Sequence, residues 1–139
     1  PVIITDRTDW VSRPDWELAR NELRAQLLDW KDAWEARDPD RFLRLYSSGM
    51  TNGEGIGWSK DKRRNILEKD WIRIGLSNIS LFLYPGATMA YAEFTQSYSS
   101  DKLSNLSNKQ LYWKQEKGIW RIALEKSKDI PISTNVAQR

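Results

Sequence analysis

The chemistry open to this chain is limited first by two missing residue types. Its 139 residues include no cysteine and no histidine. A Cys/His zinc site, a thiolate nucleophile and a Ser-His-Asp triad are therefore excluded, and no side chain has an ordinary pKa near neutrality. We predict no catalytic residue, no metal site and no cofactor, and we expect that the chain alone is not an enzyme.

Carboxylates are the remaining candidates for acid-base chemistry. Glu93 or Glu125 could act as a base if burial raised its pKa, as proton abstraction requires. Both lie in segments whose apolar and polar residues alternate as in β-strands. In the last of these segments Trp120, Ile122 and Leu124 share one face, which we place inside. We therefore expect Glu93 and Glu125 on the outer face, away from any interior pocket.

Polar and aromatic residues on an inner face are better candidates for binding. Within 88–99 one face changes from apolar to polar along the strand, in the order Ala90, Ala92, Phe94, Gln96 and Tyr98. We predict that ligand-binding positions include Gln96, Tyr98, Tyr112 and Trp58, with hydrogen bonding inside the fold as the alternative for the polar ones. The net charge is only +3, so we expect recognition by rings and hydrogen bonds rather than by charge.

Two further segments have a simpler interpretation than a binding site. The run 47–58 contains Gly49, Gly53, Gly55 and Gly57 but not the G-x-x-x-x-G-K-[ST] phosphate motif, so it predicts a loop. A helix is expected over 59–70, with Ile66 and Leu67 inward. Its basic residues are Lys60, Lys62, Arg63, Arg64 and Lys69. They could contact an anionic polymer, but a solvated helix face is favoured.

The elements that position these residues follow from periodicity. Apolar residues recur every three or four positions from Pro14, at Trp16, Ala19, Leu23, Leu27, Trp30 and Trp34, which predicts one long helix. Ser12 is the predicted N-cap of this helix. Asp38-Pro39 should end this helix and begin a short second one. Strands are predicted over 71–84, 88–99, 109–116 and 119–126, with turns at Pro85-Gly86 and Lys117-Gly118 and a polar loop over 99–108.

Large aromatic residues at these spacings should fill a single core. We place Trp30, Trp34, Trp71, Phe94 and Trp120 there. The domain limits expected are a leading segment over 1–13, one domain over 14–127 and a mobile tail over 128–139. The chain begins with Pro1 rather than methionine, and we expect it to be a piece of a longer protein.

The order of these elements resembles the nuclear transport factor 2-like superfamily, also called cystatin-like cones. The stretches 34–46, 84–98 and 109–120 are similar to the accessory cone at the C-terminus of bacterial L,D-transpeptidase and L,D-carboxypeptidase proteins. This resemblance implies an α+β fold in which a long helix and two short helices pack in a curved antiparallel sheet. It also implies a periplasmic location, although the cytoplasm stays open.

Those enzymes act on peptidoglycan stem peptides through a catalytic cysteine and histidine in a separate module, so no catalytic role is implied for this chain. The resemblance implies a non-catalytic accessory domain whose partners are a peptidoglycan fragment or an adjacent catalytic domain. Two alternatives stay open: a free-standing cone enzyme of the isomerase or dehydratase type, and a structural module that forms a homodimer through its sheet face. Charge and hydropathy indicate neither nucleic-acid binding nor membrane insertion.

Overall fold

The computed structural model describes residues 13–51 and 55–131, which form one sheet and several helices. The elements in chain order are α1 (Arg13–Glu35), α2 (Pro39–Leu43), α3 (Ser48–Thr51), α4 (Ile56–Leu67), β1 (Ile72–Leu83), β2 (Met89–Ser100), β3 (Ser104–Glu116) and β4 (Ile119–Asp129). All neighbouring strands are antiparallel, in the order β1-β2-β3-β4. The α+β architecture predicted from the sequence is therefore confirmed.

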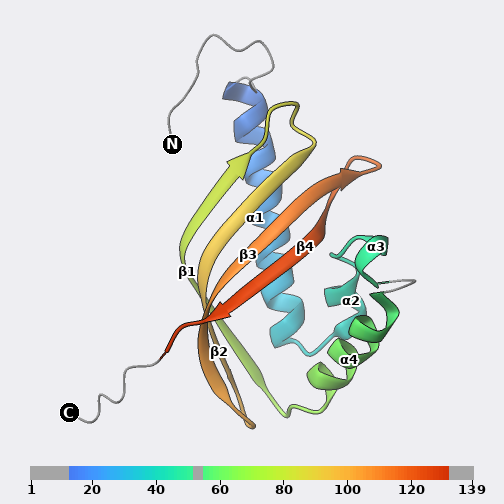
Figure 1. Ribbon diagram of the computed structural model, residues 1–139, viewed down its shortest axis with the longest axis vertical. Helices are drawn as coiled ribbons and strands as arrows, with labels where there is room; N and C mark the ends of the chain where they lie inside the picture. Colours follow the sequence, from blue (N-terminus) through green and yellow to red (C-terminus); the bar gives the residue numbers. More distant parts are fainter. Residues whose placement is uncertain (1–12, 52–54, 132–139) are drawn as a thin grey trace, which may run out of the picture.

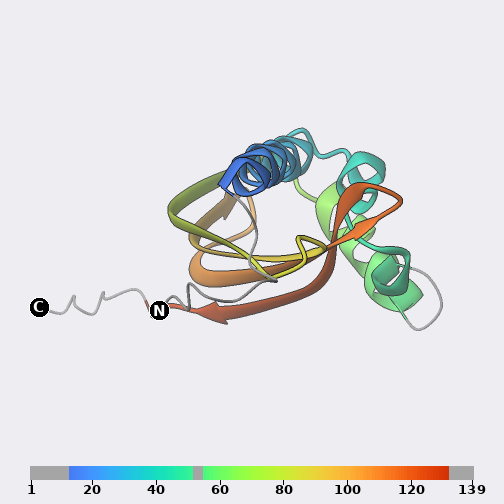
Figure 2. The ribbon, with the colours of Figure 1, turned by 90° about the horizontal axis from the view of Figure 1, so that it is seen from above.

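The long helix α1 lies across the concave side of the curved sheet, and the short helices gather at one end of it (Figures 1 and 2). The buried residues of α1 are Ala19, Leu23, Leu27, Trp30, Ala33 and Trp34. Their spacing is the one expected of an amphipathic helix that covers a sheet with a single face. The predicted cap Ser12 lies outside the described residues. No helix in the described ranges is long and apolar enough to span a membrane.

Short-range signals in the sequence determine where the next elements begin and turn. The Asp38 carboxylate accepts a hydrogen bond from the Arg41 backbone N–H at 3.1 Å, and Pro39 begins α2, as predicted. The Pro85-Gly86 turn joins β1 to β2, with Gly86 at a φ of 93°. A type II turn requires this positive φ, which glycine adopts without steric cost. Lys117-Gly118 closes the second hairpin with positive φ at both residues.

Both edge strands contain an irregularity that bends the sheet around α1. In β1 the register shifts between Ser77 and Ser80, where Asn78 has a φ of 54°. In β4 Ala123 is the extra residue, because its two neighbours pair with consecutive residues of β3. A bulge of this kind increases the local twist and helps the sheet to curl.

The bulge at Ala123 reverses the inner and outer faces of β4 from that point on. Ile122 is fully buried, but Leu124 is 46% exposed, and Glu125 pairs with the buried Leu111 on the inner face. Our prediction of an inward Leu124 and an outward Glu125 is therefore wrong. Strict alternation failed because one inserted residue shifts a pattern of period two by one position.

Residues 104–108 belong to a strand and not to the predicted polar loop. β3 begins at Ser104 and pairs with β2 from Ser104 to Lys114. The inner-face residues there, Asn105 and Ser107, line a polar cavity and not the apolar core, so the apolar alternation that marks a strand is missing. β4 likewise continues to Asp129, beyond the predicted start of the tail at 128.

The third predicted helix begins earlier than expected and differs from the prediction at its C-terminal end. α4 starts at Ile56, and α3 occupies part of the predicted glycine loop, while residues 52–54 of that run lie outside the described ranges. Leu67 is 53% exposed, whereas Lys69, placed on the solvent side by our prediction, is buried. Ile66 is buried as predicted, so the prediction fails at Leu67, the last residue of α4, and at Lys69, which follows the helix.

The core is filled by aromatic rings from α1, α2 and the sheet. Trp30 contacts Trp34, Phe42 and Phe94 with ring centroids 5.2–5.9 Å apart, and Trp113 and Trp120 are also buried. Such edge-to-face and offset contacts add stabilisation to that of area burial. Trp71 differs from our prediction, since it is 41% exposed and lies under the Arg73 guanidinium.

These packing differences predict unequal effects of removing tryptophan rings. Trp34→Ala and Trp120→Ala should each lower the free energy of unfolding by about 3–5 kcal/mol, because each leaves a cavity in the core. Trp71→Ala is the matched control and should cost less than about 1 kcal/mol, since Trp71 is 41% exposed and is not part of the buried core. Denaturant unfolding measures all three. Similar losses at Trp71 and Trp120 would contradict this packing.

Candidate functional site

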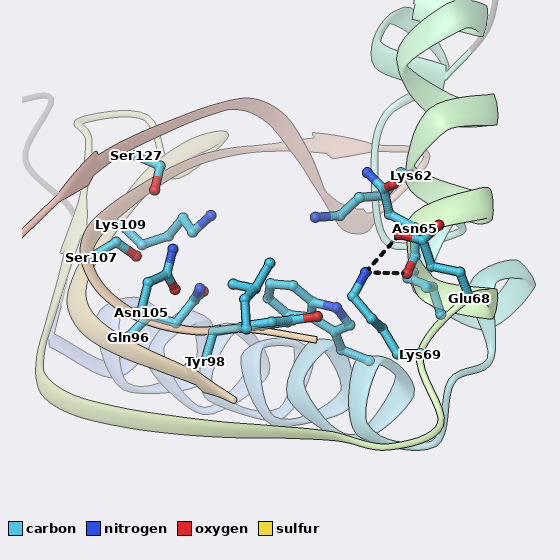
Figure 3. Close-up of a pocket in the computed structure, with 13 residues that line it drawn as sticks. Lys62, Asn65, Glu68, Lys69, Gln96, Tyr98, Asn105, Ser107, Lys109 and Ser127 are labelled. Carbon is cyan, nitrogen blue, oxygen red and sulfur yellow. Dashed lines mark hydrogen bonds and ion pairs between the residues drawn. The ribbon is translucent and has the colours of Figure 1, made fainter. Parts of the chain in front are cut away.

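A cavity of about 410 Å³ opens between the C-terminal end of α4 and the inner face of β2 and β3. Figure 3 shows polar side chains from both walls directed into it. The lining residues are Trp34, Lys62, Asn65, Ile66, Glu68, Lys69, Gln96, Tyr98, Leu103, Asn105, Ser107, Lys109 and Ser127. The volume lies in the range typical of small-molecule sites, about 300–1,000 Å³. Polar groups converge here against a wall of Trp34, Ile66 and Leu103.

Three lysines contribute amines to this cavity. Lys109 comes from β3, Lys62 from α4 and Lys69 from the residues just after α4. In Figure 3 the Lys62 and Lys109 amines point into the space from opposite walls. The sequence placed Lys62 and Lys69 on a solvated face, so it missed both. The amphipathic pattern of α4 is weak, and only the tertiary position of the helix determines where these side chains point.

Lys109, which lines the cavity, forms a buried ion pair with Glu125. Lys109 Nζ and Glu125 Oε2 are 2.8 Å apart, with side-chain exposures of 6% and 14%. The Tyr46 hydroxyl donates to the other oxygen of Glu125 at 2.5 Å, and Trp30 Nε1 donates to the Tyr46 oxygen at 2.9 Å. The four side chains form one hydrogen-bonded chain, which we call the Lys109–Glu125–Tyr46–Trp30 network. Every polar group in it has a partner, as burial requires.

The backbone around Tyr46 holds the network in place. The segment 45–47 runs beside β4, where Ile122 N–H donates to the Leu45 carbonyl and Ser47 N–H donates to the Ile122 carbonyl, both at 2.8 Å. Ile122 directly precedes the bulge at Ala123. The same short stretch of β4 therefore anchors Tyr46 and turns Glu125 inward to meet it.

Electrostatics keeps Glu125 ionised. Burial would raise the pKa of Glu125, but Lys109, Lys62 and the hydrogen bonds from Lys109 and Tyr46 together hold it below its ordinary value of 4.5. Burial and the Glu125 charge raise the pKa of Tyr46 well above 10.0. The tyrosine therefore stays a neutral donor to a permanent carboxylate at neutral pH.

The surroundings of the Lys62 amine disfavour its charged form. Burial lowers the pKa of Lys62 from 10.5 to about 8; Glu125 opposes this shift, and Lys109 and Lys69 add to it. Its Nζ lies 4.5 Å from the centre of the Trp34 ring. Within residues 13–51 and 55–131, no carboxylate lies at ion-pair distance from it.

Two of the four predicted binding residues line the cavity. Gln96 is 4% exposed, and its buried Oε1 has no hydrogen-bond partner among the described residues. Tyr98 lies beside it, with its ring 5.3 Å from that of Trp34. These two positions follow from the alternation of β2, which the structure preserves.

The other two predicted residues lie elsewhere. Tyr112 is on the outer face of the sheet, where its ring is 4.9 Å from that of Tyr91. Trp58 packs on Tyr46 at 5.0 Å and does not line the cavity. Glu93 is on the outer face as expected and accepts hydrogen bonds from Tyr91 and Asn108. Across the described ranges no cluster of acidic side chains could hold a metal ion.

Breaking the buried ion pair on one side should destabilise the fold strongly. Lys109→Met leaves Glu125 charged and unpaired, which should cost about 3–5 kcal/mol. Adding Glu125→Leu should recover most of this loss, because a buried pair is often matched by apolar residues of similar volume. Lys114→Met, which removes a more exposed partner of Glu116, should change stability by less than about 1 kcal/mol. Chemical denaturation of the wild type and the three variants checks the order, and a double variant no more stable than Lys109→Met would contradict it.

Lys62→Met should stabilise the protein at neutral pH, because the folded state disfavours the charged amine. The unfolded chain binds a proton between about pH 8 and 10.5 that the folded chain has released, so wild-type stability should rise across that window. The stability of Lys62→Met should not rise in this way. The variant should therefore be more stable than wild type near neutral pH, and this difference should disappear once the pH exceeds about 10.5. Urea titrations at about pH 7 and pH 10 measure the difference. A less stable variant at pH 7 would contradict the environment assigned to Lys62.

Comparison with known proteins agrees with this architecture. Bd1075 from Bdellovibrio bacteriovorus is 20% identical with a TM-score of 0.73 over 88% of this chain and 44% of its own. The helical cell shape determining protein Pgp2 from Campylobacter jejuni is 23% identical with a TM-score of 0.69, over 78% of this chain and 40% of its own. A proposed dehydratase of the NTF2-like family from Streptomyces avermitilis is 8% identical with a TM-score of 0.70, over 83% and 99%.

These identities show a shared fold only, and this chain spans less than half the length of Bd1075 and of Pgp2. A search of curated protein sequences gave no match. The sequence profile described as Cds6 C-terminal NTF2-like domain matches residues 22–126, which contain α2, α4 and all but the end of the sheet. The chain therefore belongs to the Cds6 C-terminal NTF2-like domain family.

Proposed function

We propose that this chain is a non-catalytic binding domain of a cell-wall modifying protein, and that its cavity holds a small polar ligand. Its family is defined by a C-terminal domain, and this chain covers 44% of Bd1075 and 40% of Pgp2. Pgp2 is described as a determinant of helical cell shape. These facts support an accessory role next to another module. The peptidoglycan fragment as ligand and the periplasm as location are what the sequence resemblance implies.

The observation that carries the proposal is the unpaired oxygen of Gln96. A buried acceptor without a partner costs about 1–3 kcal/mol, so it is retained where a ligand or a water supplies the missing donor. Gln96 Oε1 belongs to a residue lining an open cavity of about 410 Å³. Tyr98, Asn105 and Ser107 add further hydrogen-bonding groups around it. The cavity therefore has the donors and acceptors of a polar binding site.

The state of Glu125 favours binding over catalysis. A cone enzyme that abstracts protons needs a carboxylate with a raised pKa and an oxygen free to reach the substrate. Glu125 has a lowered pKa, and Lys109 and Tyr46 each occupy one of its oxygens. Glu93 is on the outer face of the sheet. Glu68 also lines the cavity, but it is half exposed and pairs with Lys69 at 3.2 Å. Among the described residues the isomerase or dehydratase alternative therefore has less support than binding.

Pairing through the sheet remains a second prediction. The outer face presents aromatic and aliphatic side chains, including Phe82, Tyr91, Tyr112 and Leu124. Apolar residues gathered on one exposed face are typical of protein contacts. A homodimer and a ligand-filled cavity are compatible, because the two surfaces lie on opposite sides of the sheet.

The two tyrosines on opposite faces provide a matched test of the binding site. Purified muropeptides should bind the protein, and Tyr98→Ala should weaken binding at least about tenfold, since it removes a ring and a hydroxyl from the cavity. Tyr112→Ala should leave the affinity unchanged. Isothermal titration calorimetry measures both. Equal losses from the two variants, or loss only from Tyr112→Ala, would place the site elsewhere.

The same muropeptides test the absence of catalysis. Incubation with the chain should leave the product profile unchanged, because the chain has neither a thiolate nor an imidazole for peptide transfer. Liquid chromatography with mass detection records the profile. A shortened or cross-linked product would refute the accessory role.

A further inference from the structure

We propose that the cavity recognises the free C-terminal carboxylate of a short peptide, placed between the Lys62 and Lys109 amines with Gln96 accepting a peptide N–H. This inference rests on the proposed binding function and specifies the chemistry of the ligand. It assigns roles to residues on three elements: α4, β2 and β3.

Charge balance in the cavity points to an anion. The cavity has three lysine amines, and two of them have a carboxylate partner. Lys109 pairs with Glu125 at 2.8 Å and Lys69 with Glu68 at 3.2 Å. Lys69 also donates to the Asn65 carbonyl at 2.8 Å and so satisfies the C-terminal end of α4. Among the described residues this leaves Lys62 as the cavity amine without an ion pair. A ligand with one negative charge would give each of the three amines a negatively charged partner.

The surroundings favour a carboxylate over a phosphate. Phosphate sites are built from backbone N–H groups at helix N-termini, but α4 presents its C-terminal end to this cavity, through Asn65 and Ile66. That end carries partial negative charge, which would oppose a dianion more than a monoanion. The rings of Trp34 and Phe42 lie close to the Lys62 amine, with their centres 4.5 and 5.5 Å from Nζ. An incoming carboxylate would therefore meet an ammonium group that has already lost much of its hydration.

Gln96 indicates that the ligand has a hydrogen-bond donor next to its carboxylate. Gln96 Oε1 is buried without a partner in the described structure, and the residue Gln96 lines the same cavity as Lys109. Position 94 of β2 pairs with Lys109, so Gln96 is two residues further along the adjacent strand, on the same face. A C-terminal peptide unit has a carboxylate and an N–H separated by one carbon atom. The rings of Trp34 and Tyr98 provide an apolar wall for the side chain on that carbon.

The test compares two probes of equal size that differ in charge. Acetyl-alanyl-alanine with a free carboxylate should bind at least about tenfold more tightly than its C-terminal amide. This ratio corresponds to a difference in binding free energy of about 1.4 kcal/mol. Sodium acetate, which has the charge but no N–H, should bind at least about tenfold more weakly than the free acid. Isothermal titration calorimetry at about pH 7 measures all three. Equal affinity of acid and amide, equal affinity of acetate and acid, or no measurable binding of the acid would overturn the inference.

Variants then assign the charge to one side chain. Lys62→Met should reduce the affinity for the acid to that for the amide, while its melting temperature shows that it is folded. Lys60→Met, on the same helix but outside this cavity, is the matched control and should bind as wild type. Gln96→Leu should weaken acid and amide by the same factor. Unchanged acid binding in Lys62→Met, or equal loss in Lys60→Met, would refute the role of Lys62.

The pH profile gives a second readout. Above about pH 8 Lys62 loses its proton, so wild-type affinity for the acid should fall, and Lys62→Met should show no such fall. The other charged or titratable groups facing Lys62 are Glu125, Lys109, Lys69, Glu68 and Tyr98. Glu125 is already ionised in this pH range. If the affinity of Lys62→Met for the free acid also fell above about pH 8, the pH dependence would belong to another of these groups and the proposal would be overturned.

The outcomes separate this inference from the proposed function. Muropeptides that bind through Tyr98 but do not depend on Lys62 would leave the binding function standing and refute the carboxylate site. Binding of the free acid through Lys62 without any binding of muropeptides would refute the cell-wall ligand and leave the carboxylate site standing.

Discussion

The ion pair between Lys109 and Glu125 is the constraint on which the functional end of this fold depends. Both charges are almost fully removed from water, so each needs its partner and further hydrogen bonds to be tolerated. Tyr46 supplies one of these bonds, and Trp30 in turn supplies a donor to Tyr46. The network thus joins α1, the segment after α2, β3 and β4. A buried pair adds little net stability, but it strongly disfavours any arrangement that separates its members.

The bulge at Ala123 allows this network to form. Without an extra residue in β4, the alternation set by Trp120 and Ile122 would direct Glu125 to the outer face. The backbone bonds of Ile122 with Leu45 and Ser47 hold the strand at that point. This local irregularity therefore turns Glu125 inward next to Tyr46, and together with the irregularity in β1 it helps the sheet to curl.

Much of the fold could be predicted from local patterns, whereas most of the site could not. The face of α1 and the turn at Gly86 each follow from a few neighbouring residues, and Gln96 and Tyr98 follow from regular alternation in β2. Glu125 was placed on the wrong face because no residue near Ala123 marks a bulge. Lys69 was assigned to solvent because its burial depends on where α4 packs. These positions are determined by contacts distant in sequence, which a single sequence does not contain.

The cavity combines features that oppose stability with features that suit recognition. A third amine near two others, and a glutamine oxygen without a donor, both raise the free energy of the empty folded state. The rigid elements around them keep these groups apart and hold them ready for a ligand. A catalytic cone needs a carboxylate that can gain and lose a proton, but here Lys109 and Tyr46 hold Glu125 in one charge state. With its carboxylate fixed in this way and Lys62 left without an ion pair in the described structure, the cavity is built to attract a charge from outside and not to transfer a proton within.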